Sequence, residues 1–87
     1  MHVYEGAEMA PHEIVAAEVR AELARQQMSG VRAARALGWT QNYISMRLRG
    51  AIPFSIADLT AVAQLLEVPV TTFFTRFEMP PGVRTPG

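Results

Sequence analysis

Residues 29–50 hold two short helical segments separated by a glycine-containing turn, and this pattern constrains the fold more than any other feature of the chain. The apolar positions recur at helical spacing: Ala33, Ala34 and Leu37 in the first segment, Ile44 and Leu48 in the second. Gly38 supplies the left-handed conformation that lets a helix stop abruptly. Thr40 is an N-cap residue for the helix that follows. Two short helices joined by about three or four residues that include glycine form a helix-turn-helix unit.

The charges of this stretch all have one sign. It contains four arginines and no acidic residue: Arg32, Arg35, Arg47 and Arg49. The whole chain has 8 basic and 8 acidic residues and a net charge of zero, so its basic residues are concentrated rather than abundant. A neutral chain with one basic face favours a selective binder of duplex DNA that has weak non-specific attraction.

The remaining sequence predicts an all-α domain of five helices. Pro11 suits the first position of a helix that runs to about Gln27. Two short helices follow at 31–37 and 41–49, and a fifth covers 70–77. Ser55 and Asp58 form a capping box for the fourth helix, whose apolar stripe is Ile56, Leu59, Val62, Ala63, Leu65 and Leu66. We expect flexible segments at 1–10 and 79–87 around a domain at 11–78.

Composition excludes several classes of protein. The absence of cysteine rules out disulfides and thiolate metal sites and suits a reducing compartment. No apolar run reaches the ~20 residues of a membrane span, and no secretory signal pattern opens the chain, so we expect a cytoplasmic protein. His2 and His12 lack partners at ligand spacing, and we expect no metal and no cofactor. No nucleophile motif is present, so we expect no enzyme.

The order of motifs across residues 14–77 resembles the Cro/repressor-type helix-turn-helix family, also called the XRE family. The motifs are Ala-Leu-Gly, Trp-Thr-Gln, Ile-Ser followed by Arg-Leu-Arg-Gly, then Pro-Phe-Ser and Leu-Leu-Glu-Val-Pro-Val. The resemblance implies a compact five-helix lambda-repressor-like domain. It also implies a sequence-specific, double-stranded DNA-binding transcriptional regulator, foremost a repressor of the phage Cro or immunity type or a small bacterial regulator.

Two positions depart from the family pattern. Gly30 stands where the family often has a glutamine that holds a phosphate and supports the second helix. Arg47 occupies the last apolar site of the unit, with Leu48 beside it. Either the second helix is slightly rotated, or the Arg47 side chain extends towards DNA with its stem along the protein surface.

In a helix that enters the major groove, the first residues and those one turn later reach base edges. This selects Gln41, Asn42, Ser45 and Met46 for base reading. Glutamine or asparagine can pair with adenine, and methionine can contact the thymine methyl group. The alternative is that Gln41 and Asn42 are merely the polar first turn of a surface helix.

The expected phosphate ligands are Arg47 and Arg49, with Arg32, Tyr43 and Thr40 as weaker members. Such contacts fix the register of a protein on DNA without reading its sequence. An ordinary solvated arginine face is the alternative, and Thr40 serves as a helix cap before any phosphate role. Trp39 is expected in the core.

One recognition helix reads few base pairs, so we expect a homodimer on an inverted-repeat operator with half-sites ~34 Å apart. Phe73, Phe74 and Phe77 are the proposed dimer surface, since aromatic clusters rarely stay exposed. Alternatively, they simply cover the core. A different class of function is an antitoxin-like interaction module that binds a partner protein and only secondarily its own promoter.

Overall fold

The computed structural model describes residues 9–77, in which the chain forms five helices and no strand. Four are α-helices and the last is a 3-10 helix: α1 (Pro11–Arg25), α2 (Gly30–Leu37), α3 (Gln41–Leu48), α4 (Ile56–Leu66) and η2 (Val70–Phe77). This confirms the all-α prediction for the described part. The expected flexible segments, apart from Met9 and Ala10, lie outside it.

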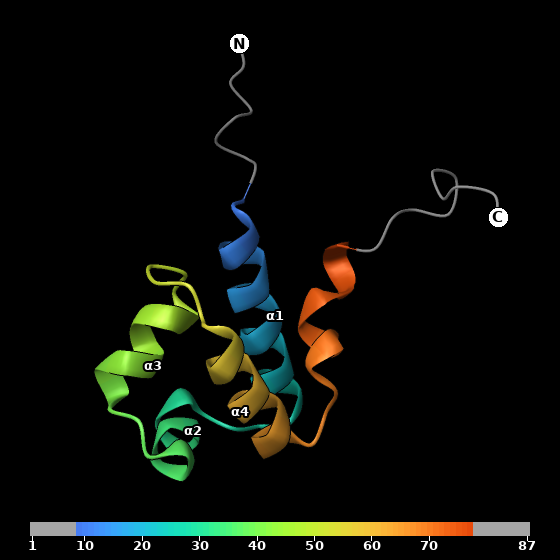
Figure 1. Cartoon of the computed structure of the whole chain (residues 1–87). Helices are drawn as coiled ribbons and strands as arrows, with labels where there is room; N and C mark the ends of the chain where they lie inside the picture. The colour runs from blue at the N-terminus through green and yellow to red at the C-terminus, as the bar shows by residue number, and fades with distance from the viewer. Residues whose placement is uncertain (1–8, 78–87) are drawn as a thin grey trace, which may run out of the picture.

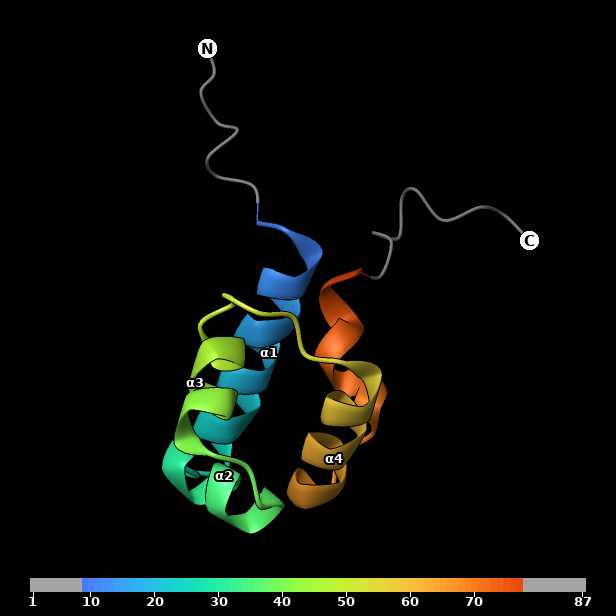
Figure 2. The same cartoon turned by 60° about the vertical axis from the view of Figure 1, so that its left-hand side comes forward.

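Helix α1 runs through the middle of the molecule, with α2 and α3 on one side and η2 on the other (Figure 1). In the turned view, the segment between α3 and α4 crosses from the end of one helix to the start of the other (Figure 2). Within residues 9–77, no single helix is long and apolar enough to cross a membrane. Helices α4 and η2 together have the required length and apolar composition, but the pair is bent by 114°.

Hydroxyl side chains begin three of the four α-helices, and the sequence predicts two of these caps, Thr40 and Ser55. Each hydroxyl oxygen accepts a backbone N–H three residues later: Ser29 from Arg32 at 3.1 Å, Thr40 from Tyr43 at 3.1 Å and Ser55 from Asp58 at 2.9 Å. The Asp58 carboxylate in turn accepts the Ser55 N–H at 3.0 Å, which completes the capping box. These bonds satisfy N–H groups that have no partner inside the helix.

The helix ends agree with the sequence where glycine marks them. Gly38 ends α2 with a φ of 73°, and Gly50 follows α3 with a φ of 79°. Helix α1 ends at Arg25, earlier than predicted, because Gln27 already adopts a left-handed φ of 56°. Glu67 closes α4 in the same way with a φ of 59°.

One core joins all five helices. Its apolar members are Val15, Ala16, Val19 and Leu23 of α1, Ala33 and Ala34 of α2, Ile44 of α3, Phe54, Leu59, Val62, Ala63 and Leu66 in or near α4, and Phe73 of η2. Leu37, Trp39 and Leu48 are half-buried and pack against this core, which confirms the expected placement of Trp39.

The predicted inward position of Ile56 is wrong, because this side chain is 75% exposed. Helical side chains lean towards the N-terminus of their helix. Ile56 is the first residue of α4, so its side chain projects past the end of the core, whereas Leu59 and Val62 lie within it.

Close packing of α2 against α3 explains the glycine at position 30. A Cβ atom built on Gly30 would lie 3.2 Å from Cδ1 of Leu48. The absence of a side chain therefore lets the start of α2 approach the end of α3. Leu48 fills the space that a larger residue at position 30 would take.

Two glycine substitutions separate backbone strain from packing. Gly38→Ala adds a Cβ atom with nothing within 4 Å, so only the left-handed backbone is strained and the free energy of unfolding falls by about 1 kcal/mol.

Gly50→Ala adds the same strain, and its Cβ atom would also lie 3.3 Å from Cγ of Glu13. The Glu13 carboxylate is held by the Ala10 N–H at 2.9 Å, so it cannot yield freely. We expect about 2 kcal/mol for Gly50→Ala, measured by urea unfolding; equal losses would contradict this account of the α1–α3 contact.

Candidate nucleic-acid interface

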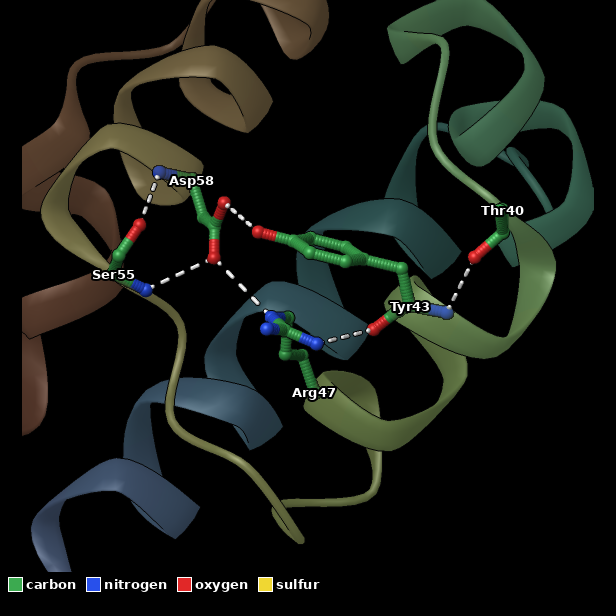
Figure 3. Close-up of polar contacts among 5 residues, drawn as sticks. All are labelled: Thr40, Tyr43, Arg47, Ser55 and Asp58. Atoms are coloured by element: carbon green, nitrogen blue, oxygen red, sulfur yellow. Dashed lines mark hydrogen bonds and ion pairs between the residues drawn. The ribbon is translucent and has the colours of Figure 1, made fainter.

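The side chains of α3 form stripes at intervals of four residues, and each stripe faces a different part of the molecule. Ile44 and Leu48 face the core, Tyr43 and Arg47 point towards the start of α4 (Figure 3), and Gln41, Asn42, Ser45, Met46 and Arg49 occupy the remaining surface. The four predicted base-reading residues and one predicted phosphate ligand therefore share the outer side of α3.

This outer surface borders α2. Gln41, Ser45 and Arg49 line a groove of about 330 Å³ whose other wall includes Gly30 and Val31. Gln41 and Asn42 are exposed at the first turn of α3, while Ser45 and Met46 are half-buried one turn later. The Arg49 guanidinium donates to the Met46 sulfur at 3.0 Å.

Exposed cations lie on both segments that border the groove. Arg32 and Arg35 are exposed on α2, and Arg49 is exposed just after α3. No acidic residue occurs anywhere between Glu22 and Asp58 in the sequence. Thr40 is exposed as well, but its oxygen already accepts the Tyr43 N–H, so its demonstrated role is the helix cap.

Arg47 is held inside the protein, and this corrects its expected role as a phosphate ligand. Its side chain is only 16% exposed, and its Nε lies 3.3 Å from Oδ2 of Asp58. Its Nη1 donates to the Tyr43 carbonyl at 3.0 Å, and the guanidinium carbon lies 3.5 Å from the centroid of the Tyr43 ring. The guanidinium is thus directed at α4 and not away from the protein (Figure 3). Of the two alternatives left open by the sequence, extension of Arg47 towards DNA is not what the structure shows.

Tyr43 is also reassigned, because its hydroxyl donates to Oδ1 of Asp58 at 2.7 Å. Trp39 covers the ring from the start of α3, with the two ring centroids 4.9 Å apart. Tyr43 therefore connects α3 to α4 and does not present its hydroxyl to solvent as a phosphate donor. Tyr43 and Arg47 position the helix on which the outer residues lie.

The Asp58 carboxylate has perturbed acidity. Burial by itself raises its pKa, but hydrogen bonds from the Tyr43 hydroxyl and from the backbone and hydroxyl of Ser55, together with the Arg47 charge, outweigh burial and lower the pKa below its usual value. The hydrogen bond between Tyr43 and Asp58 has the opposite effect on the pKa of Tyr43. Donation to the anionic Asp58 raises the pKa of Tyr43, with desolvation adding to the effect.

Contacts from α1 hold the other end of α3, and no sequence pattern predicts them. The Arg20 guanidinium donates to the Leu48 carbonyl, and Nε2 of His12 forms a hydrogen bond with the Gly50 carbonyl at 3.0 Å. The paired residues are 28 and 38 positions apart, so no local pattern reveals them. Two features of the sequence did mark Asp58. It belongs to the capping box of α4, and it is the first acidic residue after a long run without acids.

The predicted dimer surface divides into two parts. Phe73 is fully buried in the monomer and cannot contribute to an interface, so its assignment there is wrong. Phe74 is half-buried and Phe77 is 43% exposed. A 3-10 helix has three residues per turn, so Phe74 and Phe77 share a side that Phe73 does not. Their ring centroids lie 6.1 Å apart.

The described residues contain no group of three or more His, Asp or Glu side chains that could hold a metal ion. The polar groups gathered at α3 are amides, hydroxyls and guanidinium groups. These are donors and acceptors for hydrogen bonds, suited to recognising another polar surface.

Removing the Asp58 charge tests the link between α3 and α4. A lowered pKa in the folded state means that the ionised carboxylate stabilises the fold above its ordinary pKa of 3.8 and that this stabilisation is lost as the pH falls further. At pH 7, Asp58→Asn should lower the free energy of unfolding by about 1–3 kcal/mol. Urea unfolding at pH 7, 4 and 2.5 should show the difference from the unsubstituted protein shrinking towards the lowest pH.

The exposed Glu67→Gln serves as the control, with little effect at any of these pH values. A deficit of Asp58→Asn that stays constant down to pH 2.5 would refute the proposed role of the charge.

Comparisons of the chain with models of known protein families, with characterised proteins and with solved structures give no match.

Proposed function

We propose that this protein is a sequence-specific double-stranded DNA-binding transcriptional regulator, foremost a repressor, that acts in the cytoplasm. In this proposal α2, the turn at 38–40 and α3 work as the helix-turn-helix unit of a lambda-repressor-like domain, and α3 enters the major groove. One observation carries the proposal. The outer side of α3 presents amide, hydroxyl and thioether side chains between exposed arginines, in a stretch that contains no acid.

The outer residues of α3 suit the edges of base pairs. Gln41 and Asn42 stand at the first turn, where residues of a recognition helix reach bases, and each amide matches the N6 and N7 groups of adenine. Ser45 lies one turn later and can donate or accept. Met46 beside it offers an apolar contact for a thymine methyl group.

The cations around this surface suit phosphates. Arg49 follows the end of α3 and lines the groove, and Arg32 lies in the first turn of α2, the helix that forms the other wall. Arg47 is left out of this set because Asp58 neutralises it. Few phosphate contacts and zero net charge imply weak non-specific binding and a shallow dependence of affinity on salt.

A single α3 reads a short sequence, so the proposed operator is an inverted repeat bound by a homodimer, with half-site centres about 34 Å apart. A dimer places two copies of α3 in related positions, and the symmetry of the site mirrors that of the protein.

The second candidate is an antitoxin-like module whose main partner is another protein. It is favoured by a groove on the side of η2, where Phe77 and Ile56 expose apolar surface. Two results together would favour this candidate. The protein would purify from its native cell with a second protein at fixed stoichiometry, and its affinity for DNA would depend on that second protein.

Two substitutions on α3 and one control test the proposal. Asn42→Ala should relax the preference at one base position at a cost of about 1–3 kcal/mol. Arg49→Ala should weaken binding to all sequences alike and reduce the slope of log K against log salt by about 0.9. Arg76→Ala removes the same charge from η2, where Arg76 pairs with Glu18 at 3.1 Å, and should leave affinity unchanged. Selection of bound sites from random duplexes at two salt concentrations measures all three.

The roles assigned to these residues fail if Asn42→Ala and Arg49→Ala cause equal losses that do not depend on sequence. The proposal as a whole fails if the unsubstituted protein selects no sequence from the duplex library.

A further inference from the structure

An apolar groove of about 340 Å³ lies where the start of α1, the start of α4 and the end of η2 meet. Its walls include Val15, Phe54, Leu59, Phe74 and Phe77, and Ile56 stands at its rim. Ile56 is 75% exposed and Phe77 is 43% exposed, so a large branched side chain projects beside a hollow lined by apolar groups.

The exposed surface of residues 51–66, beside this groove, lacks charge. The exposed residues of this segment are Ala51, Ile52, Pro53, Ser55, Ile56, Ala57, Thr60 and Gln64, none of which is ionisable. We call these eight residues the uncharged face. His12 of α1 also lines the groove. Asp58, the one acid of this segment, is buried and paired. A helix face exposed to water normally carries charged residues, whereas charged residues are depleted from the centres of protein interfaces.

We propose that a second copy of this chain docks on the uncharged face through two-fold symmetry, with Ile56 of each copy entering the groove of the other. A two-fold interface brings the same patch of both subunits together, so that patch must carry both the projecting group and the hollow that receives it. Ile56 and the groove satisfy this requirement on one face. Two such faces also meet without like-charge repulsion and without desolvating an ion.

The inference deepens the proposed function and rests on it for its meaning, because it identifies the dimer that an inverted repeat requires. Through Asp58, Tyr43 and Arg47, the start of α4 is bonded to α3. A dimer formed at the start of α4 therefore fixes the two copies of α3 relative to each other. The exposed Phe77 remains part of the interface, whereas the buried Phe73 does not.

Single-cysteine crosslinking locates the interface, since the chain contains no cysteine of its own. Ala57→Cys places a thiol on the uncharged face next to Ile56, and Ala36→Cys places one at an exposed position of α2 as the control. With a short bismaleimide at micromolar protein concentration, we expect most of the Ala57→Cys chains and almost none of the Ala36→Cys chains to become linked dimers. Equal linkage of the two variants would overturn the assigned face.

Sedimentation velocity of the full chain measures the dimer itself. We expect the unsubstituted protein to dimerise and Ile56→Asp to raise the dimer dissociation constant at least 100-fold, because an ion would enter the groove. Ala36→Asp adds the same charge on α2 and should leave the constant unchanged. Circular dichroism should show native helix content for both variants, since Ile56 lies outside the core.

A protein that stays monomeric up to several hundred micromolar, or a dimer that survives Ile56→Asp, would overturn the inference. So would a groove filled only by a different protein. The two proposals fail separately. A monomer that still selects a DNA sequence would remove the dimer and leave the proposed function, whereas a dimer with no preference among duplexes would do the reverse.

Discussion

The carboxylate of Asp58 is the point on which the arrangement of α3 depends. It accepts the N–H of Ser55 and thereby begins α4, and it accepts the Tyr43 hydroxyl and the Arg47 guanidinium from α3 (Figure 3). An ionised group with so little exposure is tolerated only when its oxygens are fully bonded. The same three donors therefore keep the charge stable and determine how α3 lies against α4.

This interaction also divides the four arginines of residues 29–50 into two groups. Arg47 is paired with Asp58 inside the protein, while Arg32 and Arg35 remain exposed on α2 and Arg49 remains exposed just after α3. The acid-free run from residue 23 to residue 57 is thus less cationic at its surface than its composition suggests. What remains is a small number of exposed cations beside uncharged polar groups.

Local chemistry made much of the fold predictable. Thr40 and Ser55 as caps, Gly38 as a helix end and the spacing of Val15, Val19 and Leu23 each identify their element without reference to distant residues. Long-range packing decided the remainder. The left-handed residue that ends α1 is Gln27, which has no intrinsic preference for that conformation and is held by its neighbours' bonds, among them Met28 N–H to the Leu23 carbonyl.

The candidate site shows the same division. Helical spacing places Gln41, Asn42, Ser45 and Met46 away from the core, and all four keep some exposure. It could not assign Arg47, because the partner that turns it inward is 11 residues away in another helix. It also could not separate Phe73 from Phe77, since the outcome depends on the winding of η2, which is 3-10 and not α.

The contacts of Arg20 and His12 with the carbonyls of Leu48 and Gly50 have an electrostatic consequence. The carboxyl end of a helix carries partial negative charge on its unbonded carbonyl groups, which would repel an approaching anion. Here the Arg20 guanidinium places a positive charge on one of these groups, the Leu48 carbonyl, and His12 bonds the Gly50 carbonyl just beyond the helix. The amino end of α3, where Gln41 and Asn42 stand exposed, has no acidic side chain in its first turn to offset its partial positive charge.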